Sequence, residues 1–221
     1  MEAAKQDARE HYAELKAEGV TSSLDAMLKR IQQNQPPFVE APSIPAFPPY
    51  FDDVLQKYVD VLISIGGRVY KVNSYNEIIA QVEDDFAGVK RIVSFEETFA
   101  AIADTLDHNS DPHSYEDVDV CIMSSPLAVA ENSAVWISDK EMPERVLPFI
   151  AQSLVVVINK DSIVPTMHDA YNIIADKDYG FATFIAGPSK TADIEQSLVL
   201  GAHGPKTMTV FILSEYYYQG A

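Results

Sequence analysis

From Tyr50 to Leu213, short runs rich in β-branched residues alternate with longer segments whose apolar residues recur at helical spacing. A strand, a helix and a second strand in succession favour a parallel sheet, because the helix carries the chain back across one face of the sheet. The sequence therefore predicts an α/β domain with an open, mainly parallel sheet and flanking helices.

We predict seven strands in this domain, and the chain of 221 residues, 47% of them hydrophobic, can fill one such core. The strands are expected at Arg68–Val72, Val89–Ser94, Val118–Met123, Ala134–Ser138, Leu154–Ile158, Phe181–Ala186 and Thr207–Leu213. Helices are expected at Phe51–Ile63, Tyr75–Phe86, Glu96–Leu106, Met167–Ala175 and Thr191–Leu200, with a short helical turn at Pro126–Ala130.

Residues 1–49 are predicted to form an N-terminal helical extension, and residues 50–221 the α/β domain. Two helices are expected between Ala3 and Gln33, with Ser22 or Ser23 capping the second. Six of the 13 prolines follow between residues 36 and 49, and so many prolines favour an extended arm. We expect the extension to contact a neighbouring subunit in a homo-oligomer.

Charge and cysteine content exclude several classes of partner. Lys and Arg total 16 against 33 Asp and Glu, a formal charge of -17 that opposes binding to nucleic acid or an anionic membrane. The single Cys121 cannot form an intramolecular disulfide or hold an iron–sulfur cluster, and its apolar run 118–123 predicts a buried thiol. The polar opening residues and the lack of a long apolar run predict a cytoplasmic protein.

The most informative stretch is residues 187–196, directly after the predicted strand Phe181–Ala186. The backbone N–H groups at the start of the predicted helix, with the hydroxyls of Ser189 and Thr191 and the Lys190 ammonium, could hold a carboxylate or phosphate. This stretch is not a P-loop, because Ser189 occupies the position of the glycine that precedes Lys-Thr in a P-loop.

The same stretch has an alternative interpretation. Ser189 or Thr191 could simply cap the helix, with Asp193 and Glu195 complementing its dipole. In the ligand-binding interpretation, Asp193 and Glu195 would instead orient Lys190 or a ligand hydroxyl. The residues alone leave both possibilities open.

Glu131 and His203 are the candidate catalytic residues, although no catalytic role is assigned to either. His203 follows Gly201 in a loop, where it could act as an acid–base group, contact a ligand or be structural. Glu131 follows the strand of Cys121, and could be a nucleophile, a ligand contact or a cap of backbone amides. We expect one site between the start of the Thr191 helix, the His203 loop and the segment from Ser124 to Glu131.

No metal or nucleotide cofactor is predicted in this chain. Residues 107–111 begin like a calcium loop, but Pro112 and Val118 occupy the positions of the required Gly and Glu. The pair Gly66-Gly67 lacks the spaced glycines and the following helix of a dinucleotide-binding turn.

The stretch from Gly187 to Glu195, continued by Leu198, Gly201 and residues 203–205, resembles the lactate utilisation protein C branch of the LUD domain family. Ala130-Glu131 match part of a second family segment, in which residues 132–134, Asn-Ser-Ala, replace Thr-Gly-Thr. The resemblance implies a fold of the NagB/RpiA/CoA transferase-like group.

The resemblance also implies a role beside two iron–sulfur partner proteins in oxidising L-lactate to pyruvate. The clusters are then expected only on the partners, and the expected ligand of this chain is a small carboxylate or phosphate. Faint similarity of Glu131-Asn132 to a glutamate loop of coenzyme A transferases leaves an alternative: an acyl-coenzyme A or sugar-phosphate enzyme that uses Glu131.

Overall fold

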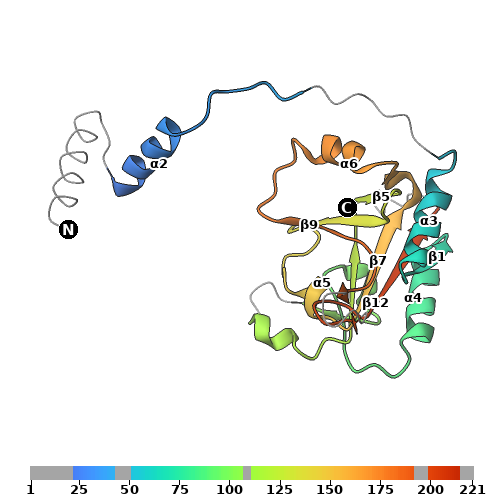
Figure 1. Ribbon diagram of the computed structural model, residues 1–221. Coiled ribbons are helices and arrows are strands. Elements are labelled where there is room, and N and C mark those ends of the chain that lie inside the picture. The colour runs from blue at the N-terminus through green and yellow to red at the C-terminus, as the bar shows by residue number, and fades with distance from the viewer. Residues whose placement is uncertain (1–21, 43–50, 107–110, 192–198, 215–221) are drawn as a thin grey trace. The chain divides into compact units, whose positions relative to one another are not determined.

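The computed structural model describes residues 22–42, 51–106, 111–191 and 199–214 (Figure 1). The chain separates into two compact units, residues 1–47 and 48–221. The boundary predicted near residue 49 and the first predicted helix fall in residues 43–50 and 1–21, outside the described residues.

The first unit contains the helix α2, Ser23–Gln33. Ser22 is its N-cap, as predicted, and its hydroxyl accepts a hydrogen bond from the Asp25 amide at 3.1 Å. One face of the helix exposes large apolar side chains at the spacing i, i+3, i+4, i+7. These residues are Leu24, Met27, Leu28 and Ile31.

The second unit contains the α/β domain. Its main sheet is formed by β1 (Arg68–Val72), β2 (Ile92–Ser94), β3 (Asp104–Thr105), β4 (Val120–Ser124), β7 (Ser153–Asn159) and β12 (Thr207–Leu213). The other strands are β5 (Leu127–Val129), β6 (Ala134–Ser138), β8 (Ile163–Val164), β9 (Ala182–Ile185), β10 (Lys190–Thr191) and β11 (Val199–Leu200). The helices are α3 (Val54–Ser64), α4 (Tyr75–Asp85), α5 (Leu147–Ile150) and α6 (Met167–Ile174), with 3-10 turns η1 (Glu97–Phe99), η2 (Pro112–Tyr115) and η3 (Lys160–Ser162).

The main sheet has the strand order β1-β12-β7-β4-β2-β3, and every pairing in it is parallel. Its central strands are buried on both faces, which explains their nearly continuous apolar sequences. The prediction of an open, mainly parallel α/β sheet with flanking helices is confirmed.

Four layers build the domain (Figure 1). Ile78 and Val82 of α4 pack on one face of the main sheet. The other face, which includes Cys121, packs against α3 and a second sheet of order β8-β5-β6-β9. The far side of that second sheet is covered by Ala170 and Ile174 of α6.

The second sheet contains two of the seven predicted strands, which the sequence analysis had not assigned to a sheet of their own. The predicted strands Ala134–Ser138 and Phe181–Ala186 pair with each other, in antiparallel register, as β6 and β9. The sequence correctly located them as strands. It could not assign them to a sheet, because alternation along one strand does not specify its partner.

Two predicted helical segments are wrong, and a third is wrong at both of its ends. Glu96–Leu106 forms η1 and β3, because β3 pairs with β2. Pro126–Ala130 contains the strand β5 instead. All three residues of β5 are buried, and β5 pairs with β6 on one side and with β8 on the other. Thr191–Leu200 begins and ends in strands, since β10 pairs antiparallel with β11, and residues 192–198 lie outside the described part. Long-range pairing outweighs local helix propensity in these segments.

None of the helices in the described ranges combines the length and apolar character needed to cross a membrane.

Candidate functional site

The motif around Gly187 joins two segments of the chain into one rim. Gly187 has a φ of +68°, and a Cβ at this position would lie 2.7 Å from Cδ1 of Ile65. Only glycine fits both constraints. The Ser189 amide donates to the Pro205 carbonyl at 2.8 Å, and the Gly201 amide donates to the Ser189 carbonyl at 3.1 Å. These two bonds hold the His203 loop against the Ser189 segment.

A cavity of about 530 Å³, here called the amino-edge cavity, opens at this rim. It lies at the amino ends of β7 and β12, where the Lys206 amide donates to the Gln152 carbonyl at 2.8 Å. Its polar side chains come from Asn132, Ser189, Lys190 and His203, so the structure brings the last three, which are predicted ligand residues, together. Apolar lining comes from α3, α5 and β9, through Ile65, Pro148, Phe149, Phe184 and Ile185.

The amino-edge cavity suits an anion. Lys190 and His203 are exposed, and no described residue that lines the cavity is acidic. Lys190 also has a structural neighbour, because a Cβ at Gly66 would lie 3.9 Å from its Nζ. The ammonium thus lies beside the carboxyl end of α3, where a cation is favoured by the helix dipole.

The remaining predicted ligand residues lie elsewhere. Thr191 lies in the strand β10, so it does not begin a helix as predicted, and residues 192–198 lie outside the described residues. Asp193 and Glu195 fall outside the described residues. Glu131 is exposed, and its Oε1 accepts a hydrogen bond from the Met167 amide at 3.0 Å. That contact matches the capping interpretation of Glu131, at the first turn of α6.

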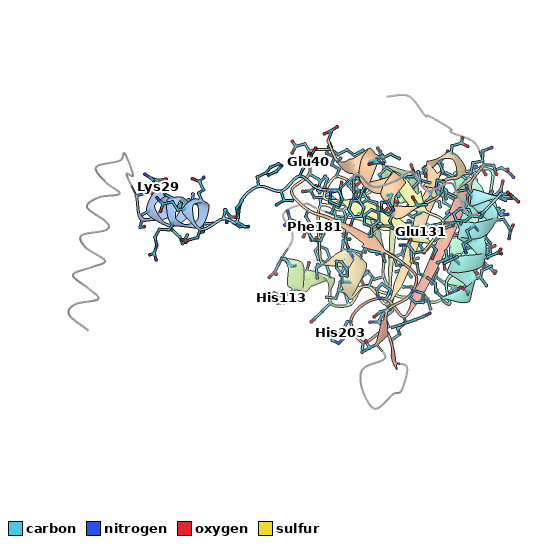
Figure 2. The ribbon with its side chains drawn as sticks, turned by 45° about the horizontal axis from the view of Figure 1, so that its top comes forward. Lys29, Glu40, His113, Glu131, Phe181 and His203 are labelled. Atoms are coloured by element: carbon cyan, nitrogen blue, oxygen red, sulfur yellow. The ribbon has the colours of Figure 1, made fainter. Side chains whose placement is uncertain are left out.

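The expectation of one site that includes Ser124, Glu131 and His203 is also corrected. Ser124 ends β4, whereas His203 precedes β12, and in a parallel sheet these two positions lie on opposite edges. The five residues of β4 place the edges about 16 Å apart at roughly 3.3 Å per residue. Figure 2 shows Glu131 and His203 well separated on the domain.

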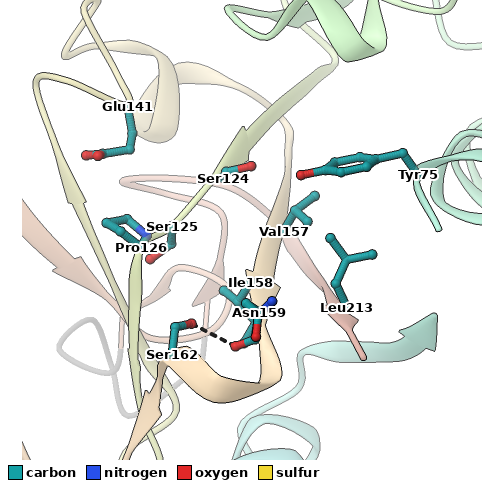
Figure 3. Close-up of a pocket in the computed structure, with 10 residues that line it drawn as sticks. All are labelled: Tyr75, Ser124, Ser125, Pro126, Glu141, Val157, Ile158, Asn159, Ser162 and Leu213. Atoms are coloured by element: carbon teal, nitrogen blue, oxygen red, sulfur yellow. Dashed lines mark hydrogen bonds between the residues drawn. The ribbon is translucent and has the colours of Figure 1, made fainter. Parts of the chain in front are cut away.

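A second cavity, of about 300 Å³, lies at the carboxyl ends of β4, β7 and β12 and is called the carboxyl-edge cavity (Figure 3). Its lining consists of Tyr75, Ser124, Ser125, Pro126, Glu141, Val157, Ile158, Asn159, Ser162 and Leu213. Of these lining residues, only residues 124–126 belong to the site that the sequence predicted. The available signal was a polar residue directly after each of several predicted strands, the place where α/β sheets gather ligands.

Glu96 contacts the lining residue Ser124 and was not among the predicted site residues, because the sequence predicted it at the start of a helix. Its carboxylate accepts a hydrogen bond from the Ser124 hydroxyl at 2.9 Å. Burial raises the pKa of Glu96 above its ordinary value, although the bond from Ser124 opposes the shift. Burial, and secondarily the charge of Glu96, raises the pKa of the Cys121 thiol to about 12. Cys121 is buried, as predicted.

Within the described ranges, no group of three or more His, Cys, Asp or Glu side chains is arranged to hold a metal ion. Residues 107–110 of the acidic loop lie outside those ranges.

A family model described as the LUD domain matches residues 92–213 of this chain. The chain is similar to Lactate utilization protein C of Anoxybacillus flavithermus, with 36% identity over 92 residues, 41% of this chain and 42% of that protein. It is also similar to Lactate utilization protein C of Oceanobacillus iheyensis, with 33% identity over 104 residues, 44% of this chain and 45% of that protein. Each match thus covers less than half of the relative's length.

A solved structure with the same fold is the crystal structure of a DUF162 family protein from Deinococcus radiodurans at 1.70 Å resolution. The TM-score is 0.57 at 15% sequence identity, and the match covers 73% of this chain and 96% of that chain.

Proposed function

The chain belongs to the LUD domain family, and from this premise we propose that it works in lactate utilisation, as an accessory subunit that supports the oxidation of L-lactate to pyruvate. The names of the matched relatives support this role. With one buried cysteine, the chain itself has too few thiolates for an iron–sulfur cluster. Electron transfer is therefore assigned to iron–sulfur proteins that act as partners.

The ligand proposed for this subunit is a small carboxylate of the lactate class, bound in the amino-edge cavity. The carrying observation is that Ser189, Lys190 and His203 line one cavity without an acidic neighbour among its described lining residues. Lys190 and His203 would bind the carboxylate by charge-assisted hydrogen bonds, and Ser189 would bind the ligand hydroxyl. The apolar lining would receive the methyl group.

Titration of the full-length protein with L-lactate tests the ligand assignment. A ligand that binds only the folded state raises the melting temperature, so lactate should stabilise the wild type. Lys190→Gln and His203→Gln should each weaken that response about tenfold in apparent affinity, the effect of losing one charged contact. Lys160→Gln, which removes an exposed lysine outside the cavity, is the matched control. Equal responses in all four proteins would exclude this cavity as the lactate site.

The proposed absence of redox groups from this chain has its own test. The purified native protein should show no flavin, nicotinamide or iron–sulfur absorption and no lactate oxidation alone. It should restore L-lactate oxidation when iron–sulfur proteins encoded beside it are added. A stoichiometric chromophore in the isolated chain would contradict the accessory role.

Self-association is the remaining part of the proposal. The exposed apolar stripe of α2 is a surface that a second copy could cover. Leu28→Glu should then lower the mass measured by sedimentation, whereas Lys29→Glu on the same helix should not. An unchanged mass in Leu28→Glu would remove α2 from the interface.

A further inference from the structure

The chain connections run across the main sheet in opposite directions from two neighbouring strands, β2 and β4. Along the chain, β2 is followed by β3 on the outer side of the sheet, whereas β4 is followed by β7 and then β12 in the opposite direction. Where the connections of adjacent parallel strands diverge, the loops separate and leave a crevice at the carboxyl ends. This switch point is the expected place for a ligand in an open α/β sheet.

A side-chain pair spans the switch point. Glu96 follows β2, Ser124 ends β4, and the Ser124 hydroxyl donates to Oε2 of Glu96 at 2.9 Å. Glu96 is itself held in place, since its amide donates to the buried Ser94 hydroxyl at 3.1 Å, which donates to the Ile122 carbonyl at 3.0 Å. The Ser124 proton is therefore directed toward Glu96, and the oxygen keeps lone pairs for another donor.

Ser124 belongs to the carboxyl-edge cavity, and Figure 3 shows its hydroxyl pointing toward the hydroxyl of Tyr75. Asn159 adds an amide, while Val157, Ile158 and Leu213 add apolar surface. The Asn159 side-chain oxygen accepts from the Asp161 amide at 2.8 Å, which directs the NH₂ group away from that bond. Hydroxyl oxygens and an amide donor are thus presented next to apolar walls.

The charge of this cavity restricts its guest. No Lys, Arg or His is among the described residues that line it, and its one carboxylate, Glu141, accepts from the amide and hydroxyl of Ser138. An anion would lose its hydration without gaining a counter-charge, and Glu96 behind Ser124 would repel it. A neutral guest with hydroxyl groups meets donors and acceptors at no such cost.

We propose that the carboxyl-edge cavity binds a small uncharged compound that carries hydroxyl groups, and that Ser124 accepts a hydrogen bond from it while donating its own proton to Glu96. Glu96 is then a positioning residue, because it orients Ser124 without touching the ligand. The site is separate from the proposed lactate cavity and does not depend on the role of that cavity. Its volume of about 300 Å³ is at the lower end for ligand pockets and favours a compact guest.

Three compounds with one carbon skeleton test the proposal: propane-1,2-diol, L-lactate and 1-amino-2-propanol are neutral, anionic and cationic. They are titrated into full-length protein with labelled Ile, Leu and Val methyl groups. Val157, Ile158 and Leu213 report on the carboxyl-edge cavity, and Ile65 and Ile185 report on the amino-edge cavity. The diol should shift the first set of methyl signals at lower concentration than either charged compound.

Variants then test the pair. Ser124→Ala should weaken the diol response about tenfold, as expected for one lost hydrogen bond, and Ser124→Thr should retain it. Glu96→Leu, which removes the acceptor but keeps Ser124, should also weaken it. Ser114→Ala, at an exposed serine outside both cavities, is the matched control.

Several outcomes would overturn the proposal. These are no diol response in wild-type protein, a stronger response of the same methyl groups to lactate or the amine, and a full diol response in folded Ser124→Ala. If Ser124→Ala does not fold, the comparison of the three compounds on wild type decides. A lactate response at Ile65 and Ile185 bears only on the proposed lactate site, so the two proposals can fail independently.

Discussion

The two cavities lie at opposite edges of one parallel sheet and differ in charge. Two basic side chains, Lys190 and His203, line the amino-edge cavity, whereas the carboxyl-edge cavity has hydroxyls, an amide and one carboxylate. The chain carries a net charge of -17, yet its anion-compatible cavity has no acidic residue among the described residues that line it. Contact groups determine local binding, because distant surface charge is screened over about 8 Å in physiological salt.

The cavities also differ in how the chain assembles them. Most of the polar lining of the amino-edge cavity comes from two short segments, 187–190 and 203–205, joined by backbone hydrogen bonds, and Asn132 adds a third contribution. The carboxyl-edge cavity collects residues from Tyr75 to Leu213 at the ends of strands. A motif can therefore mark the first cavity, while the second exists only after strands have paired.

The largest expected loss of stability comes from a substitution at the rim of the amino-edge cavity. Gly187→Ala should lower the free energy of unfolding by about 3 kcal/mol, because it adds left-handed backbone strain to a clash with Ile65. Gly88→Ala is the control, since Gly88 has a φ of +87° but no atom within 4 Å of the added Cβ. Its loss should be about 1 kcal/mol. Equal losses in urea denaturation would mean that the contact with Ile65 does not constrain the rim.

A smaller effect on stability, and one that depends on pH, is expected at Glu96 beside the carboxyl-edge cavity. Burial raises the pKa of Glu96, so the folded protein binds this proton more tightly than the unfolded chain. The stability gained from binding this proton is complete below the ordinary carboxyl pKa. It is lost as the pH rises through the raised pKa of Glu96 in the folded protein. The free energy of unfolding of Glu96→Gln should therefore equal that of wild type at about pH 4. At about pH 7 it should exceed that of wild type by about 1 kcal/mol.

The control for this pH series is Glu97→Gln, at the exposed neighbouring residue. Thermal unfolding across the pH range provides the measurement. A constant difference between Glu96→Gln and wild type would show that the Glu96 carboxyl does not titrate between the two pH values.

The smallest expected effect concerns Glu131, which the comparison assigns to neither cavity. Glu131→Ala should cost about 0.5 kcal/mol, the scale of a carboxylate at a helix N-terminus, because Glu131 accepts from the Met167 amide of α6. Glu83→Ala, at an exposed position of α4, should cost less. Responses to lactate and to the diol should both persist. A covalent adduct with acyl-coenzyme A that disappears in Glu131→Ala would instead support the acyl-transfer alternative.

Much of the fold follows from local sequence. The strands Arg68–Val72, Ala134–Ser138 and Thr207–Leu213 lie where the sequence predicts them. Strands in a sheet covered by other elements are buried on one or both faces. Burial gives each strand an apolar or alternating pattern that can be recognised over only a few residues. The gathering of Ser189, Lys190 and His203 was predictable for a similar reason, because they belong to one continuous motif.

Tertiary structure alone decided the strand order and the separation of the second sheet from the main sheet. It also decided the strand character of residues 190–191 and 199–200, which form a separate two-stranded sheet. It also decided the pairing of Glu96 with Ser124, which are 28 residues apart and meet because β2 pairs with β4. Composition and periodicity carry no information about which strand lies beside which. Contacts of that kind depend on burying whole faces together, and this long-range packing overrides the helix propensity of a short segment.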